Sequence, residues 1–525
     1  MFVASLTIGI YSYLIFLLGI LGLLYKNIII SLSVLYFFAA FIFLLKLKII
    51  NINFTKIKLS RFSKFFLSII LLQALVNLIG ALGPELAFDA LWYHLTIPKI
   101  FLENHKIFHI SGNLLYYSDL PKSIDLIYLS ALSFSNEILA KIIHFSFGVL
   151  SVLALYKLSR RFLNQELSLL SCLIFYSNLV VGWQSITAYT DLGRTFFEIA
   201  AFYEFILWIE KKKLRNLIYA GVLIGLSLTA KISAINSIFI FSLLILLINF
   251  YNSLSIKNFV KDILTFLFFS ILMPLPYFIF SYLNTGNPIF PLFESSFQFT
   301  FDRNPLNIIQ LFLYSLDPIS PVYLIFLPIV IFLFKGFDIK LKILFYYSIL
   351  SLIFWYLTSS FGGSRFILPY LPAFSILTVI AVNFVKNKLF KKYLVLLIIA
   401  IALSSISYRF LANYKYIPVI LNIESKDNFL SNNLNFSFGD FYDTDGYLKA
   451  NIKKGDKVLL YGFHNLYYVN FPYIESSQVK KGDRFNYVAV KNSVLPARFL
   501  DWKEIYYNKQ TKVKLYSKGE KLWVY

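Results

Sequence analysis

The chain has 525 residues, of which 58% are hydrophobic and 14% are charged, and its formal net charge is +22. Soluble domains are usually about a quarter charged, so this composition excludes an ordinary soluble protein. Apolar runs of about 20 residues recur along the chain, and each is long enough to cross a hydrocarbon core of about 30 Å. A membrane β-barrel would instead show alternating segments of about 10 residues. We therefore expect a polytopic α-helical membrane protein.

Lys and Arg outnumber Asp and Glu by 49 to 27, but their positions argue against nucleic-acid binding. They cluster in short loops on alternate sides of the apolar runs, as cytoplasmic loops of membrane proteins do. We therefore expect membrane lipids, and no nucleic acid, among the partners. The single cysteine, Cys172, lies inside an apolar run, so the chain is expected to form no intrachain disulfide.

The first two apolar runs, residues 5–24 and 26–45, are followed by a basic segment from Lys46 to Lys64. By the positive-inside rule this segment is cytoplasmic, and so is the N-terminus. A third span, residues 65–82, then carries the chain to the opposite side of the membrane. The long loop that follows, residues 83–136, is therefore predicted to be extracytoplasmic.

This first loop is rich in titratable groups, and three of the five histidines of the chain lie in it. Residues 88–103 and 123–134 are apolar with scattered polar groups, which predicts helices lying along the membrane surface. So many titratable side chains in one loop of a membrane protein indicate that chemistry takes place there.

Ten further apolar runs lie between residues 138 and 411, which brings the expected total to about 13 spans. In this arrangement every basic cluster lies on one side of the membrane. Both long loops, residues 83–136 and 284–317, lie on the other side. From about Ala412 no run of membrane length remains. Residues 412–525 are expected to form a small soluble α/β domain, with a helix near residues 442–453. Its strands are predicted at residues 457–462, 487–490, 513–517 and 521–525.

Two carboxylates of the first loop are candidates for catalysis. Glu85 and Asp89 are four residues apart, so they share one face if the segment is helical, and Tyr93 continues that face. A carboxylate among aromatic residues at the membrane boundary can have its pKa raised towards that of a general base. The alternative is a solvated acid at a helix N-terminus, where it favours the helix dipole.

Three charged residues near the outer ends of later spans are candidates for ligand binding. Asp191 either belongs to a helix cap or faces Asp89 across an outer cavity, where it could bind a metal or sugar hydroxyls. Lys231 interrupts an apolar span, and an ionisable residue there is a functional-site hypothesis by default. Arg365 follows Gly362, Gly363 and Ser364 and offers a planar fork suited to phosphate. Phosphate binding by Lys231 and Arg365 is favoured over snorkelling to the interface.

The histidines show no metal-ligand spacing. His94, His105 and His109 lack the HExxH pattern of zinc proteases and are expected to make interfacial polar contacts rather than to bind a metal. His144 is expected to pack between helices. His464 is expected in a loop or at the surface of the C-terminal domain.

Several segments, taken in order, resemble the GT-C glycosyltransferases, above all the protein O-mannosyltransferase and lipid A aminoarabinose transferase group. They are FDALWYHLTIPKIFLENHKI, YYSDLP, AYTDL, the span end GLSLTAK, GNPIFP and SRFILPYLP. The resemblance covers residues 65–411 and implies an all-α GT-C transmembrane catalytic core. It makes residues 1–64 two additional N-terminal helices with a basic cytoplasmic loop, and residues 412–525 an extracytoplasmic domain.

The resemblance implies an enzyme that moves a sugar from a polyprenyl-phosphate donor to an extracytoplasmic glycan, lipid or protein, with inversion. Asp89 would deprotonate the acceptor hydroxyl, and Asp191 would lie near the donor or a divalent metal. Lys231 and Arg365 would hold the leaving phosphate. Glu85, Tyr93 and His94 would contribute to substrate binding.

The chain departs from the family in its two extra helices and in lacking a tight acidic pair, which leaves metal dependence open. The location expected is a prokaryotic cytoplasmic membrane. A lipid-linked glycan flippase or transporter, and a glycan polymerase or ligase, are the alternatives. A transporter would place its charges at mid-membrane.

Overall fold

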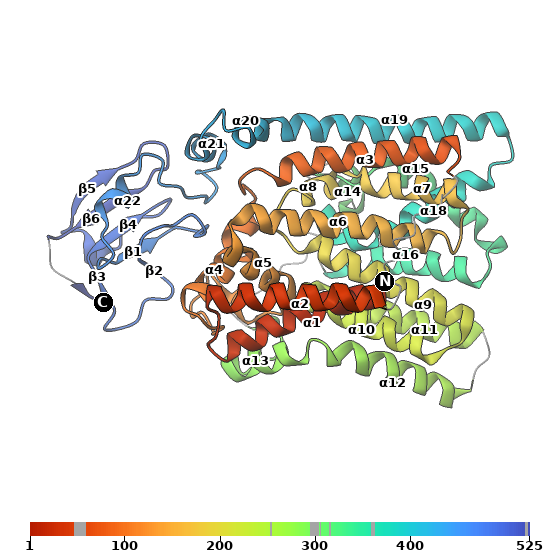
Figure 1. Ribbon diagram of the computed structural model, residues 1–525, viewed down its shortest axis with the longest axis horizontal. Coiled ribbons are helices and arrows are strands. Elements are labelled where there is room, and N and C mark those ends of the chain that lie inside the picture. The colour runs from red at the N-terminus through yellow and green to blue at the C-terminus, as the bar shows by residue number, and fades with distance from the viewer. Residues whose placement is uncertain are drawn as a thin grey trace.

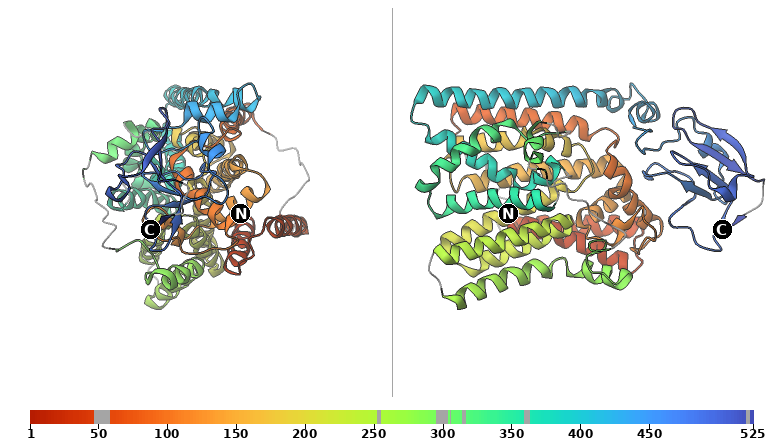
Figure 2. Two further views of the ribbon diagram at one scale, coloured as in Figure 1. Left: turned by 90° about the vertical axis from the view of Figure 1, so that its left-hand side faces the viewer. Right: turned by 180° about the vertical axis from the view of Figure 1, so that it is seen from behind.

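Long apolar helices lie side by side along one axis, and a small sheet domain caps one end of this bundle (Figures 1 and 2). The structure, a computed structural model, describes residues 1–46, 59–251, 255–294, 304, 306–313, 317–358, 363–519 and 523–525. The helices of the bundle are α1 (Phe2–Ile20), α2 (Lys26–Lys46), α3 (Arg61–Ala81), α6 (Glu137–Ser159), α7 (Gln165–Tyr176), α8 (Leu179–Gln184), α9 (Asp191–Lys211), α10 (Leu214–Ala230), α11 (Ile235–Tyr251), α12 (Ile256–Leu272), α13 (Leu275–Thr285), α14 (Asn307–Leu313), α15 (Pro321–Leu333), α16 (Ile339–Thr358), α17 (Ser364–Ile367), α18 (Leu371–Phe384) and α19 (Lys388–Asn413).

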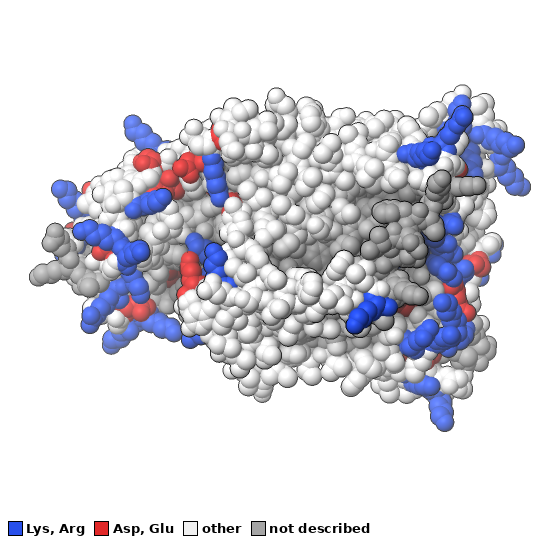
Figure 3. Space-filling view, viewed as in Figure 1, with Lys and Arg blue, Asp and Glu red and all other residues white. Residues whose placement is uncertain are grey.

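The two ends of the bundle differ in their charge and in the structural elements that lie there. The short helices α4 (Thr96–Glu103) and α5 (Ser123–Phe134) lie at the same end as the sheet domain, which we call the loop end (Figure 1). Apart from those on the sheet domain, Lys and Arg gather mostly at the opposite end, which we call the basic end (Figure 3). There Arg161 and Lys340 both pair with Glu210.

Local sequence fixes where several of these helices begin. Five of them, like α15 after Ser320, start after a Ser or Asn whose side-chain oxygen accepts a hydrogen bond from a backbone N–H of the first turn, which satisfies a donor that the helix itself leaves free. These cap residues are Ser60, Asn136, Asn164, Ser255 and Asn387.

The protein is a multi-pass membrane protein. Within the described residues, eight helices are long and apolar enough to cross a bilayer, or nine if the bent pair α12 and α13 forms one span. Each of the 13 segments predicted as spans overlaps a helix, but several of these helices are short, so the number 13 stays a prediction. The span predicted over residues 263–282 corresponds to two helices, α12 and α13, which meet at 59°. Pro274 and Pro276 explain the break, since proline cannot donate within a helix.

The helix α5 does not lie exposed on a membrane surface, as the sequence had suggested. Nearly all of its side chains are buried, and it packs against α1, α2, α4 and α6. Its few polar residues therefore face protein rather than lipid headgroups. The buried position of α5 therefore places its polar side chains inside the bundle.

The central helix α9 is buried along almost its whole length. It packs against α10, and α10 in turn packs closely against α12. Gly221 and Gly225 of α10 make this approach possible, because a Cβ atom at Gly225 would lie 2.7 Å from the carbonyl oxygen of Ser270. Small residues four apart are a common way for membrane helices to pack.

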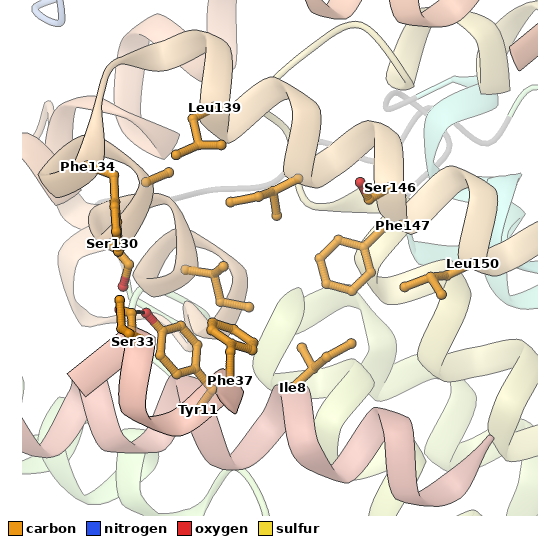
Figure 4. A pocket seen from close by; sticks show the side chains of 14 residues that line it. Ile8, Tyr11, Ser33, Phe37, Ser130, Phe134, Leu139, Ser146, Phe147 and Leu150 are labelled. Carbon is orange, nitrogen blue, oxygen red and sulfur yellow. Dashed lines mark hydrogen bonds between the residues drawn. The ribbon is translucent and has the colours of Figure 1, made fainter. Parts of the chain in front are cut away.

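A cavity of about 510 Å³ lies between α1, α2, α5 and α6 (Figure 4). Its hydroxyl groups are bonded within the protein: Tyr11 to Ser33 at 2.6 Å, and Ser130 and Ser146 to carbonyl oxygens of their own helices. The remaining lining is hydrocarbon. This cavity therefore offers contact surface for an apolar chain but no chemistry.

The C-terminal domain contains a five-stranded sheet with strand order β2–β1–β4–β6–β5 and a separate β3–β7 pair. Strand β1 pairs in parallel with both β2 and β4, and β4 pairs antiparallel with β6. The strands are β1 (Val458–Tyr461), β2 (Tyr473–Glu475), β3 (Arg484–Phe485), β4 (Tyr487–Val490), β5 (Lys503–Tyr507), β6 (Lys514–Ser517) and β7 (Trp523–Val524), and the helices are α20 (Ile417–Ile420), α21 (Lys426–Asn433) and α22 (Tyr447–Asn451).

The predicted strands at 457–462, 487–490 and 513–517 are confirmed as β1, β4 and β6, and β7 lies in the fourth. The predicted helix over residues 442–453 is confirmed only as the shorter α22. The strands β2, β3 and β5 were missed, because β2 and β3 are very short and β5 carries charged, exposed residues.

The sheet domain is bonded firmly to the first loop. Lys99 of α4 donates to the carbonyl oxygens of Tyr467 at 3.0 Å and Val469 at 2.6 Å. Glu137, the first residue of α6, follows directly after the first loop. Its buried carboxylate accepts from the Lys426 ammonium at 2.5 Å and from the Tyr467 hydroxyl. The first loop and the sheet domain therefore form one structural unit at the loop end.

Lys99→Met should loosen this unit locally. Hydrogen bonds from a charged group typically contribute about 1.5–3 kcal/mol each, so amide exchange in residues 466–470 should become roughly tenfold faster or more. Hydrogen–deuterium exchange measured by mass spectrometry would show it. The matched control is Lys106→Met in the same loop, an exposed lysine, which should leave exchange unchanged. Equal exchange rates in the two variants would contradict this account of the docking.

Candidate functional site

Two buried ion pairs lie at the loop end, and each joins segments distant in the chain. An Arg365 Nη1–H donates to Asp89 Oδ2 at 2.5 Å. The Lys231 ammonium donates to both oxygens of Asp191, at 2.7 and 2.8 Å. The Asp191 side chain is completely buried, and the other three are at most 17% exposed. All four were predicted as site residues, and the structure brings them together.

The local sequence explains how these side chains are presented. Asp191 is the first residue of α9, and Lys231 immediately follows the last residue of α10. A carboxylate at a helix N-terminus and an ammonium at a helix C-terminus both favour the helix dipole. Arg365 lies in α17, which follows Gly363 with a φ of 60°, a left-handed conformation that favours glycine.

The surroundings of Asp89 hold its carboxylate in the charged form. Asp89 precedes the π-helical turn η1 (Ala90–His94), and Tyr93 donates its hydroxyl to Asp89 Oδ2 at 3.2 Å. The Tyr189 hydroxyl accepts from the Asp89 backbone N–H at 3.1 Å. Burial alone would raise the pKa of Asp89, but the charge of Arg365, helped by His94, brings that pKa below its ordinary value. The expectation of a raised pKa is therefore wrong.

Glu85 lies outside the helical turn, so it does not share a face with Asp89 as the spacing suggested. Its carboxylate accepts from the backbone N–H groups of Leu86, Ala87 and Ala188, the last at 2.6 Å. Burial raises the pKa of Glu85 above its ordinary value, although Lys141 and these bonds oppose the effect. Glu85 thus ties the first loop to the segment before α9, and we no longer assign it to substrate.

His94 is paired with an acid that the sequence analysis did not single out. Its Nδ1 lies 2.7 Å from Asp125 Oδ1, and its Nε2 is buried without a hydrogen-bond partner among the described residues. The His94 side chain is 5% exposed. The clue to Asp125 was its place as the one charged residue of α5, a helix of mostly apolar residues.

The other histidines have structural contacts. His109 pairs with Asp119 at 2.9 Å, and His105 stacks on Tyr25. His144 lies 2.8 Å from the Thr187 carbonyl oxygen and accepts from the Leu192 N–H, so it packs between helices as predicted. The remaining histidine, His464, lies in a loop of the C-terminal domain as predicted and is half-buried, because its ring packs against Phe88 and Trp92 beside Asp89.

A second buried charge cluster lies next to the ion pairs. Arg194 of α9 donates to Ser233 at 2.9 Å and to the Tyr370 hydroxyl at 2.9 Å, and Glu198 lies 3.9 Å from it. One guanidinium therefore links the segment after Lys231 to the segment after Arg365. Sequence reasoning missed Arg194, although a charge in a buried membrane helix is itself a signal.

A cavity of about 530 Å³ brings these groups together. Both cations, Lys231 and Arg365, line it, whereas Asp89 and Asp191 lie behind them. Asp125 and Thr190 supply further polar groups. The remaining lining is aromatic, apolar or weakly polar: Tyr93, His94, Tyr116, Tyr117, Leu120, Pro121, Ala230, Ile232, Ser233, Ile235, Asn236, Pro291, Leu292, Phe293, Thr358 and Phe366. Such a cavity suits a ligand with an anionic group and an apolar part.

A metal ion at Asp191 finds little support in the donor set. Both Asp191 oxygens accept from Lys231. Across the described ranges, no three His, Cys, Asp or Glu side chains lie close enough to hold a metal ion. Gly362, predicted as a flexible neighbour of Arg365, lies outside the described residues, and so do residues 295–303, 305 and 314–316 of the second loop at 284–317.

Asp89→Asn should reduce stability in a pH-dependent way. Removing one partner of a buried ion pair typically costs about 3–5 kcal/mol. The apparent unfolding temperature in detergent should therefore fall by several degrees at pH 7. Because the folded pKa of Asp89 is lowered, the wild-type pair is complete at neutral pH and is lost only as pH falls through that pKa. The gap between the proteins should narrow below about pH 4.

Differential scanning fluorimetry from pH 8 down to about pH 2.5 measures this gap on both sides of the ordinary Asp pKa. Asp501→Asn provides the control, because the Asp501 carboxylate is 55% exposed and should leave the unfolding temperature unchanged. An Asp89→Asn protein as stable as wild type at pH 7 would show that the pair adds nothing to the fold.

Comparison with known proteins agrees with this architecture. Residues 127–278 match a family model described as dolichyl-phosphate-mannose-protein mannosyltransferase. No curated protein sequence matches the chain.

Among solved structures, ArnT from Cupriavidus metallidurans is similar both bound to undecaprenyl phosphate and in the apo state. The bound form is 12% identical with a TM-score of 0.56, covering 86% of this chain and 97% of ArnT. The apo form is 10% identical with a TM-score of 0.58, and the match covers 87% of this chain and 98% of ArnT.

The archaeal oligosaccharyltransferase AglB from Archaeoglobus fulgidus, in complex with an inhibitory peptide and a dolichol-phosphate, is also similar. It is 14% identical with a TM-score of 0.50, and the match covers 82% of this chain and 70% of AglB. At these identities the structural matches show the shared fold. The family-model match covers residues 127–278, and the structural matches to ArnT and AglB extend over more than four fifths of this chain.

Proposed function

We propose that this protein transfers a sugar from a polyprenyl-phosphate donor to an acceptor outside the cytoplasm, with inversion at the anomeric carbon. The observation that carries the proposal is the cavity in which Lys231 and Arg365 face apolar and aromatic walls. A lipid-linked phosphate sugar has the chemistry that this lining requires: an anion, hydroxyl groups and a hydrocarbon tail. The ligands of the two similar structures, undecaprenyl phosphate and a dolichol-phosphate, support the same choice.

The two cations would act on the leaving group. When the bond from the anomeric carbon to the phosphate oxygen breaks, both of its electrons pass to that oxygen and the phosphate gains negative charge. Lys231 and Arg365, already fixed by their carboxylates, stabilise that charge more in the transition state than in the donor. Arg365 can bind phosphate through its planar fork, while Lys231 acts as a point charge.

Asp89 would act on the acceptor. In the structure its carboxylate is bonded to Arg365, which makes it a weak proton acceptor. A phosphate in the cavity would compete for the same guanidinium and weaken that bond, so the affinity of Asp89 for a proton would rise when the donor is present. Donor binding would thereby prepare Asp89 to take the proton of the acceptor hydroxyl.

The remaining site residues take supporting roles in this proposal. Asp191 orients Lys231 through two hydrogen bonds, and a divalent metal beside Asp191 remains a proposal that a metal-dependence test would decide. Tyr93 and His94 line the cavity and would contact the donor sugar or the acceptor. The acceptor in this proposal is an extracytoplasmic glycan, lipid or protein.

The orientation in the membrane follows from charge. Lys and Arg gather at the basic end (Figure 3), and basic residues are retained on the cytoplasmic side. We therefore assign the loop end and the sheet domain to the extracytoplasmic side of a prokaryotic cytoplasmic membrane. In this assignment residues 65–411 are the catalytic core, residues 1–64 an N-terminal addition and residues 412–525 the extracytoplasmic domain.

Turnover should depend on Asp89. We would supply the purified protein with labelled polyprenyl-phosphate sugars and an envelope extract as acceptor. Wild type should transfer or release label, and Asp89→Asn should be slower by about 100-fold or more, because it lacks the proton acceptor. The control is Asp119→Asn, a buried carboxylate of the same loop that lies outside the cavity lining. Equal turnover by wild type and Asp89→Asn would remove Asp89 from this role.

Binding of the phosphate should depend on Lys231. Lys231→Met should weaken the affinity for undecaprenyl phosphate about tenfold or more, since a hydrogen bond to a charged group contributes about 1.5–3 kcal/mol. Microscale thermophoresis would measure it. Affinity for undecaprenol, which lacks the phosphate, should be unchanged by the substitution. Wild type that binds undecaprenyl phosphate but never turns over any sugar donor would favour a lipid-linked glycan flippase instead.

A further inference from the structure

The His94–Asp125 pair has the arrangement of an oriented base, and the roles assigned above do not explain it. Ionised Asp125 only accepts hydrogen bonds, so the 2.7 Å contact places a proton on His94 Nδ1. In the neutral ring this leaves a lone pair on Nε2. That atom is buried and has no hydrogen-bond partner within the part of the chain that the structure describes. A buried unsatisfied polar atom typically costs about 1–3 kcal/mol, which argues for a function.

The position of His94 links it to the proposed chemistry. Both His94 and Asp125 line the cavity that contains Lys231 and Arg365. His94 is the last residue of η1, and Asp89 precedes the first. The i to i+5 bonding of this π-helical turn brings residues five apart onto roughly the same side, and such turns are frequent at functional sites. His94 is also among the charges that act on Asp89.

Asp89 is poorly suited to keep a proton. Its bond to Arg365 and the hydrogen bond from Tyr93 both stabilise the carboxylate, and once the product phosphate leaves, Arg365 is again available to Asp89 alone. A proton taken from the acceptor therefore needs another group to hold it. A neutral imidazole oriented by a carboxylate is the usual solution in proteins.

We propose that His94 Nε2 is the final proton acceptor of the transfer and that Asp125 is its positioning residue. This inference rests on the proposed function. The acceptor oxygen forms its bond to the anomeric carbon as the bond to the phosphate oxygen breaks, with that bond's electrons going to the phosphate. The hydroxyl proton passes to Asp89 and from Asp89 to Nε2 of His94. Asp89 returns to its carboxylate form, and the resulting imidazolium is stabilised by Asp125.

The test uses the full-length protein in nanodiscs with the labelled polyprenyl-phosphate sugar that wild type turns over. His94→Ala should lower kcat about 100-fold or more, while KM for the donor changes less than about threefold. Added imidazole should restore at least part of this loss, because the substitution leaves space for it. Asp125→Asn should lower kcat at least about tenfold. The matched control is His109→Ala, which breaks the similar His109–Asp119 pair outside the cavity lining and should keep kcat within twofold.

A second measurement does not depend on turnover. Nitrogen-15 NMR of histidine-labelled wild type should show His94 with Nδ1 protonated and Nε2 unprotonated. The signal is assigned by its loss in His94→Gln. A wild-type protein without turnover would refute the proposed function, and the NMR would still decide the tautomer. Wild-type kcat in His94→Ala, a purely KM effect, no rescue by imidazole, or a protonated Nε2 in neutral His94 would each overturn the role of His94.

Discussion

Burying positive charge in a membrane protein is the constraint on which the loop end depends. An ionised side chain loses its hydration when it is buried, and it is tolerated there only with a partner of opposite charge. Here Lys231 and Arg365 each have one, and each partner comes from a different part of the chain. Satisfying the two cations therefore fixes the first loop against α17 and the start of α9 against the end of α10. The same requirement that holds the fold together creates a cavity lined by two preorganised cations.

The sequence was most informative where a single physical rule dominates. Apolar runs predicted the long helices of the bundle, because the bilayer demands length and apolarity alone, whereas the short α14 lies in what was predicted as a loop. The charges at Lys231 and Arg365 stood out for the same reason, since they interrupt or end such runs. Asp89 and Asp191 were found through the family resemblance as much as through their positions. The structure then showed what no pattern could, namely which acid pairs with which base.

The errors have physical causes that lie beyond local sequence. Glu85 and Asp89 are four apart, but the helical turn begins only after Glu85, whose carboxylate instead binds three backbone N–H groups. The pKa of Asp89 depends on an arginine 276 positions away, so its direction could not be predicted from its neighbours. The amphipathic character of α5 indicated a surface helix, whereas its polar face lies against the interior. Asp125 was overlooked because its partner, His94, belongs to a separate segment.

The bonds between the first loop and the sheet domain have a consequence for biosynthesis. Residues 83–136 leave the ribosome early, yet Lys99 binds carbonyl oxygens of Tyr467 and Val469, which lie about 370 residues later. His464, from the same late segment, packs beside Asp89 against Phe88 and Trp92. The surroundings of the first loop are therefore complete only after residues 464–469 have been made. A nascent chain that ends before these residues would contain Asp89 without the His464 ring that packs against its aromatic neighbours, so the site cannot assemble fully in shorter nascent chains.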